Sequence, residues 1–128
     1  MKLLFVRHGE STANANGVLS SYPGDEVSLT ELGRAQAGQL CLKLPDPIDF
    51  VYVSPLKRTI ETAEIVLENR SSDISIDPRI KEVDYGSYSG CPNSAELDSI
   101  REMQVQGNYM VRFGDSGENK LDVLNRLY

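Results

Sequence analysis

Near its start the sequence reads Leu3-Leu4-Phe5-Val6-Arg7-His8-Gly9-Glu10-Ser11, an apolar run that stops at charged and small residues. Consecutive apolar residues with aromatic and β-branched members are typical of a strand that is buried on both faces. Arg-His-Gly then lies where the strand ends, and in open α/β sheets this rim is where ligands bind. His8 is also the only histidine in the chain. The stretch therefore predicts an α/β sheet with a candidate site at its edge.

The first half of the chain predicts alternating strands and helices. Residues 2–6 and 50–53 are short apolar runs that read as buried parallel strands. Between them, Thr30 is a good N-cap for a helix that Pro45 ends. The polar stretch 17–27 is expected to be a loop. Strands and helices in this order predict right-handed crossovers and a sheet covered by helices on both faces.

The second half predicts shorter elements. Ser54 is expected to cap a helix with Pro55 at its first position. Residues 74–76 alternate like a third, edge-type strand. A further helix is expected over residues 95–103, and a last one should start near Ser116. The apolar stripes expected for the helix after Ser54 and for the last helix are, respectively, Leu56, Ile60, Ala63 and Leu67, and Leu121, Leu124 and Leu127.

Composition limits the class of protein. The 128 residues are 40% hydrophobic and 25% charged, which predicts one globular domain, residues 1–128, without an internal boundary. The 13 basic and 19 acidic residues give a net charge of -6, which argues against a broad nucleic-acid or anionic membrane surface. Cys41 and Cys91 lack metal-like spacing, and one histidine cannot build a His-based zinc set. We expect a reduced, cytoplasmic compartment, no membrane and no nucleic acid.

Arg7-His8-Gly9 after a predicted strand resembles the signature of the histidine phosphatase superfamily, also called the phosphoglycerate mutase-like family. That resemblance implies a three-layer α/β/α fold with a mostly parallel sheet, a phosphohistidine intermediate on His8, and neither cofactor nor metal. Other pieces of the family pattern follow in order: Asn14, Leu29-Thr30-Glu31-Leu32-Gly33, Ser54 to Thr59 with Thr62-Ala63, Glu82 to Gly90, and Gly117-Glu118-Asn119.

The resemblance also implies roles for individual residues. A neutral histidine can attack a phosphoryl group when cations take up charge on the phosphate oxygens, and Arg7 and Arg58 would supply them. Arginine suits this better than lysine because its planar fork can bind two oxygens at once. Glu82 matches the family's acid, which protonates the leaving oxygen and then activates water. The positions that match its substrate side are Ser11, Asn14 and Tyr85.

Each of these residues also has a plainer interpretation. A lone histidine after a strand is often a structural residue, and Glu82 alone resembles any surface carboxylate. Arg58 could be a solvated helix residue paired with Glu61 or Glu64. Asn14, Tyr85 and Gly117 could be turn or packing residues. The order and spacing of all the pieces together favour phosphate chemistry.

The chain departs from the family pattern in one respect. The family's second histidine, expected at the end of a later strand, has no counterpart, because His8 is the only histidine. That later strand is expected beside the first one, so its absence would leave backbone groups unpaired. We therefore expect a form truncated at its C-terminus, or a homo-oligomer or other segment that covers the exposed sheet edge. A catalytically weak phosphate-binding or regulatory member is the alternative to an enzyme.

The segment before Gly117 bears on the choice between phosphatase and mutase. By resemblance, mutases carry a long basic insertion there, whereas residues 91–114 hold only Arg101 and Arg112 as cations. A metal-independent phosphatase is therefore expected, and a phosphoglycerate mutase is the less favoured alternative. The expected partner is a small phosphorylated metabolite.

Overall fold

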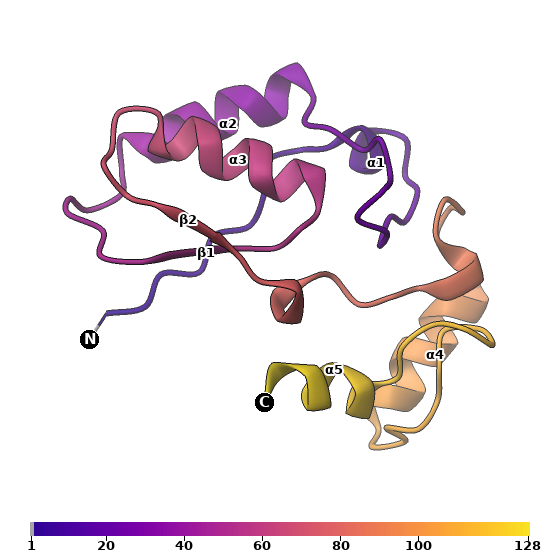
Figure 1. Cartoon of the computed structure of the whole chain (residues 1–128). Helices are drawn as coiled ribbons and strands as arrows, with labels where there is room; N and C mark the ends of the chain where they lie inside the picture. Colours follow the sequence, from indigo (N-terminus) through magenta and orange to yellow (C-terminus); the bar gives the residue numbers. More distant parts are fainter. Residues whose placement is uncertain (1) are drawn as a thin grey trace.

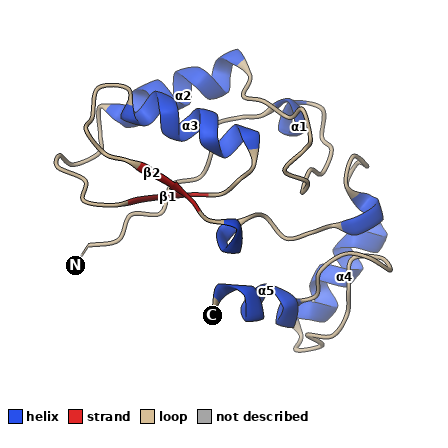
Figure 2. Ribbon diagram, in the orientation of Figure 1, coloured by secondary structure: helices blue, strands red, loops and turns tan. Residues whose placement is uncertain are grey.

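The computed structural model describes residues 2–128 and has mixed α/β architecture. Helices α2 and α3 lie side by side on one side of a parallel pair of strands, and α5 lies on the other side (Figures 1 and 2). This confirms the α/β class with a parallel sheet. The elements in order are α1 (Thr12–Ala15), α2 (Glu31–Cys41), β1 (Val51–Val53), α3 (Lys57–Leu67), β2 (Ile74–Ile76), the 3-10 turns η1 (Pro78–Ile80) and η2 (Gly86–Tyr88), α4 (Ala95–Val105) and α5 (Lys120–Leu127).

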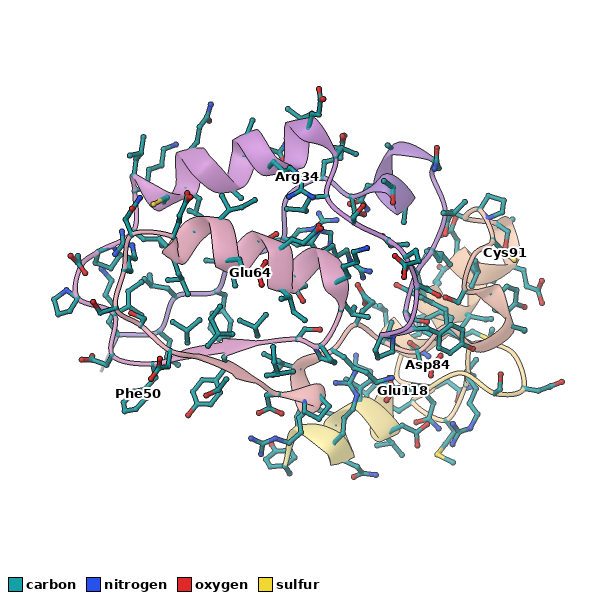
Figure 3. All side chains as sticks on the ribbon, turned by 45° about the horizontal axis from the view of Figure 1, so that its top comes forward. Arg34, Phe50, Glu64, Asp84, Cys91 and Glu118 are labelled. Atoms are coloured by element: carbon teal, nitrogen blue, oxygen red, sulfur yellow. The ribbon has the colours of Figure 1, made fainter. Side chains whose placement is uncertain are left out.

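The sheet consists of β1 and β2, which pair in parallel with Val51 opposite Ile74 and Val53 opposite Ile76. Helix α3 makes the crossover between them, as expected for parallel neighbours. Phe50, predicted to begin the strand, lies outside it with 79% of its surface exposed. Figure 3 shows this ring at the edge of the molecule, pointing away from the helices.

The prediction of a strand over residues 2–6 is wrong. These residues make no ladder bonds, and Leu3, Leu4, Phe5 and Val6 are 66%, 48%, 94% and 47% exposed. Apolar content predicts burial only when a neighbouring strand and a helix layer are present to receive it. In residues 2–128 the sheet has two strands, and neither pairs with this segment.

Helix α2 begins as predicted, because the Thr30 side chain caps it by accepting the Gly33 N–H. Helix α3 begins two residues later than predicted, at Lys57, after a Leu56 in extended conformation. Leu56 is 2% exposed, so this extended residue places a large side chain in the core before the helix starts. The Ser54 hydroxyl accepts the Leu56 N–H at 3.4 Å instead of capping a helix.

Helix α4 matches its prediction, and Ser94 caps it by accepting the Leu97 N–H. Helix α5 starts at Lys120 and not near Ser116, because the N-cap is Asn119, 2% exposed and in a capping box with Asp122. Its three leucines were expected to form an apolar stripe, but all three are partly exposed. No helix in the described part of the chain combines the length and apolarity that crossing a membrane needs.

Two hydrophobic clusters form the interior. The first packs α2 and α3 on the sheet around Ala37, Val66 and Leu67. The second lies around Leu97, Ile100 and Phe113, and Leu19 and Tyr85 pack against it. Since Leu19 and Tyr85 come from segments on either side of α3 in sequence, the loop after α1 and the segment after β2 meet at the second cluster.

Candidate active site

His8 is held in one tautomer by two neighbours. Its Nδ1 lies 2.7 Å from the Gly9 carbonyl oxygen, which can only accept, so Nδ1 carries the hydrogen. Its Nε2 lies 3.1 Å from Arg58 Nε, which can only donate. The imidazole is therefore neutral, with the Nε2 lone pair directed at the guanidinium.

Arg58 comes from the first turn of α3 and is 5% exposed. Besides His8, it donates from Nη1 to the Ser20 hydroxyl at 3.3 Å and from Nη2 to the Ser20 carbonyl at 3.1 Å. The interpretation of Arg58 as a solvated partner of Glu61 or Glu64 is therefore wrong. Glu61 instead accepts bonds from the Arg34 side chain and the Leu29 N–H.

The hydroxyl of Thr62 joins the two segments that carry His8 and Arg58. It accepts the buried Gly9 N–H at 3.2 Å and donates to the Arg58 carbonyl at 2.7 Å. On the other side of Gly9, a Cβ would come within 2.8 Å of the Gly33 carbonyl carbon in α2. Gly9 is therefore required by a close approach of two backbones, which fixes the distance between His8 and the helices.

Burial and nearby cations favour the neutral imidazole. Partial burial is the largest cause that lowers the pKa of His8 below 6.5, and the positive charges of Arg58 and Arg7 act in the same direction. The Gly9 carbonyl and the Glu82 carboxylate oppose them. Burial also lowers the pKa of Arg58, against the negative charges of Glu82 and Asp25. A neutral histidine beside a charged guanidinium suits an incoming anion.

A small cavity of about 120 Å³ lies on the α2 side of His8. Arg7 lines it and is exposed, with its charge close enough to influence both His8 and Arg58. The remaining lining comes from Gly9, Gln36, Ala37, Leu40 and Thr62. Arg7, His8 and Arg58 thus lie near one another although they come from two distant segments, and their roles toward substrate stay predictions.

Glu82 lies near this group without touching it. The side chain is exposed and accepts the Val83 N–H at 3.0 Å. Its charge nevertheless influences the pKa of His8, Arg58 and Tyr85. The Arg126 side chain of α5 holds the backbone here, donating to the carbonyls of Arg79, Lys81 and Glu82. Glu82, the acid candidate, therefore lies on a segment whose backbone is held by Arg126.

The three substrate-side candidates lie in different surroundings. Ser11 is fully buried and caps α1, donating its hydroxyl to Asn14 Oδ1 at 2.9 Å. Asn14 is exposed, and its Oδ1 also accepts the Ser11 N–H. Tyr85 is half-buried, packs edge-on against Phe113, and lies under Arg101. Burial raises the pKa of Tyr85. Their roles toward substrate stay predictions.

Sequence reasoning missed the residues that hold Arg58 and His8 in place. Thr62 belongs to the Thr62-Ala63 motif, so the sequence indicates its place in the helix but not the bonds that its hydroxyl makes. Ser20 and Asp25 lie in a stretch that reads only as a polar loop, and nothing in the sequence distinguishes them from their neighbours. Their positions depend on how the loop folds against the segment after β2.

The sequence profile of the histidine phosphatase superfamily (branch 1) matches residues 3–128. Phosphoserine phosphatase 1 of Hydrogenobacter thermophilus is 34% identical over 132 residues, which cover 99% of this chain and 61% of that protein. A 2,3-bisphosphoglycerate-dependent phosphoglycerate mutase of Thermoplasma acidophilum is 36% identical over 88 residues, 68% of this chain and 44% of the mutase. The chain belongs to the histidine phosphatase superfamily.

Solved structures agree with this assignment. The α-ribazole phosphatase of Shigella flexneri superposes with a TM-score of 0.75 at 28% identity, covering 94% of this chain and 60% of that one. Bacillus stearothermophilus YhfR gives a TM-score of 0.72 at 30% identity, with 94% and 60% covered. The chain thus spans about 60% of the length of these proteins.

Proposed function

We propose that this chain carries the nucleophile and phosphate-binding half of a metal-independent phosphatase site, and that His8 Nε2 takes the phosphoryl group from a small phosphomonoester. The observation that supports this most directly is the pair of bonds on the ring. Gly9 fixes the hydrogen on Nδ1, and Arg58 stands 3.1 Å from the free lone pair. A nucleophile must be unprotonated at the attacking atom and close to groups that stabilise the phosphate charge.

The reaction proceeds in two displacements. A phosphate oxygen replaces Nε2 as the acceptor of the Arg58 Nε–H, the Nε2 lone pair forms the N–P bond, and the P–O bond to the leaving group breaks. The Glu82 carboxylic acid gives its proton to the leaving oxygen. Water then attacks phosphorus, Glu82 takes the water proton, and the N–P bond breaks to release phosphate and the neutral ring.

Pairing of the nearby cations supports a phosphatase over a mutase. A mutase must hold a second anionic group of its substrate. Arg101 is bound to Asp98 and Asn93, and Arg112 to Asp122 and the Gly117 carbonyl. With their charge already compensated, these arginines offer little to a second phosphate or carboxylate.

The test is hydrolysis of p-nitrophenyl phosphate by the full chain in the presence of a chelator, together with trapping of acid-labile phosphate on the protein. We expect turnover and one phosphoryl group on wild type, and neither on His8→Gln. Arg58→Met should lose activity while Lys57→Met keeps it, because Lys57 is an exposed neighbour bound to Glu26. Equal rates in wild type and His8→Gln refute the proposal.

A phosphate-binding protein without turnover is the second candidate. It is favoured by the place of Glu82, which is exposed, accepts the Val83 N–H and touches neither His8 nor Arg58. A proton donor that does not reach the leaving oxygen cannot assist its departure. Titration calorimetry with inorganic phosphate separates the two candidates: saturable binding that needs Arg58, without hydrolysis, supports the second, and absence of binding excludes it.

A further inference from the structure

We propose that Ser20 and Asp25 are positioning residues for Arg58: Ser20 holds the guanidinium against His8, and the Asp25 carboxylate fixes the Ser20 hydroxyl as an acceptor. The inference deepens the proposed function, on which its rate measurement rests. Arg58 is bound through three different nitrogens, Nε to His8 and Nη1 and Nη2 to Ser20. These bonds define both the rotation and the plane of the fork.

The Ser20 hydroxyl has one hydrogen and can therefore donate once. It donates to Asp25 Oδ2 at 2.9 Å, so its lone pairs face the Arg58 Nη1 at 3.3 Å. Without the carboxylate, the hydroxyl can rotate and present its hydrogen elsewhere. The donors are therefore defined: Arg58 donates to both His8 and Ser20, and Ser20 donates to Asp25.

The loop that carries Ser20 is itself anchored. Leu19 donates its N–H to the Cys91 carbonyl at 2.9 Å and accepts the Gly90 N–H at 2.8 Å. Ser21 is fully buried and accepts the Tyr85 N–H at 3.1 Å. Because both neighbours of Ser20 are fixed, its carbonyl is a rigid acceptor, 7% of the residue being exposed. A rigid acceptor can orient a long side chain that would otherwise sample several rotamers.

The bonds to His8 and Ser20 use only part of the Arg58 fork. Arginine has five N–H groups, and in residues 2–128 the bonds to His8 and Ser20 use one on each nitrogen. One N–H on Nη1 and one on Nη2 stay available for phosphate oxygens. Ser20 thus orients the cation without blocking it.

NMR titration of the imidazole tests the positioning directly, because the chain has a single histidine and its resonances need no separate assignment. Arg58 and Arg7 lower the pKa of His8, and Glu82 raises it. Releasing Arg58 should therefore shift the pKa upward. We expect this shift in Ser20→Ala and in Asp25→Ala, and not in Ser20→Thr, which keeps the hydroxyl.

Two matched controls stand in the same loop. Ser28→Ala removes a hydroxyl that has no contact with Arg58, and Glu26→Gln removes a charge next to Asp25 that is bound to Lys57 instead. Both should leave the pKa of His8 as in wild type. Rates with p-nitrophenyl phosphate should fall about 10- to 100-fold in Ser20→Ala and stay unchanged in the controls.

The inference is overturned if Ser20→Ala and Asp25→Ala titrate like the controls. If Ser20→Ala does not fold, Asp25→Ala decides alone, because its side chain lies at the outer end of the bonded series. A wild-type chain without phosphatase activity refutes the proposed function only, since the titration still shows whether Ser20 and Asp25 position Arg58.

Discussion

Alanine at two glycines of α2 should have opposite effects on stability. A Cβ at Gly33 would lie 2.9 Å from the Glu10 backbone nitrogen and carbonyl carbon, and closer still to the carbonyl oxygen. Carbon atoms pack at about 3.5–4.0 Å, so one backbone must move by roughly 1 Å. At Gly38, five residues further along the helix, a Cβ meets nothing within 4 Å.

The magnitudes follow from these distances. Overpacking a tight contact typically costs about 1–3 kcal/mol, and we expect the upper end because the Glu10 backbone is bonded on both sides, its N–H to Gln36 Oε1 and its carbonyl oxygen to the Thr30 N–H. Alanine gains about 1 kcal/mol over glycine in a helix interior. Gly33→Ala should therefore lose about 2 kcal/mol, and Gly38→Ala should gain up to ~1 kcal/mol, a gap of about 3 kcal/mol between the same substitution at two sites.

Urea unfolding followed by far-UV circular dichroism measures this gap as a difference in midpoint at equal slope. Because Glu10 lies two residues from His8, Gly33→Ala should also reduce hydrolysis of p-nitrophenyl phosphate, while Gly38→Ala should not. Equal urea midpoints for Gly33→Ala and Gly38→Ala would show that the close backbone approach does not hold the segment of His8, and the reasoning would fail.

Three further outcomes are expected. Burial keeps the pKa of His8 below 6.5 in the folded chain, so between that lowered pKa and pH 6.5 the unfolded chain binds more protons than the folded chain. The stability that the neutral ring contributes above pH 6.5 is therefore lost as pH falls through this interval. The urea midpoint of wild type relative to His8→Gln should fall over the same interval. Arg58→Lys, which loses the planar fork on Ser20, should weaken phosphate binding in calorimetry by roughly tenfold or more. Asn119→Ala, which removes the cap on the Asp122 N–H, should cost about 1 kcal/mol in urea unfolding, and no change in midpoint would contradict the cap.

Local signals in the sequence located several elements well. The Thr30 cap, the helix predicted over residues 95–103 and the alternation at Ile74–Ile76 each depend on neighbours within a few residues. The apolar run at residues 2–6 misled because strand formation depends on a partner that local sequence does not supply. The start of α3 was misplaced because the core required an extended Leu56, which outweighed the proline signal at position 55.

The site was predictable to a similar extent. The pairing of His8 with Arg58 follows from two motifs whose types and order are informative. The bonds of Ser20 and Thr62 could not be predicted from the sequence, because a serine in a polar loop and a threonine in a helix are common in any chain. The Ser20 contacts depend on the loop folding onto the segment near Tyr85, where the Tyr85 N–H bonds a residue 64 positions earlier. The Thr62 contact depends on α3 packing against the segment of Gly9.

The Arg126 guanidinium reaches the backbone of Glu82, 44 positions earlier in the chain, and is also bound by Glu118. The position of Glu82, the acid candidate, thus depends on a side chain in the last turn of α5. Replacing Arg126 by alanine would release the Glu82 backbone and leave both bonds of the His8 ring in place, so a change in the last turn of α5 separates the acid candidate from the nucleophile.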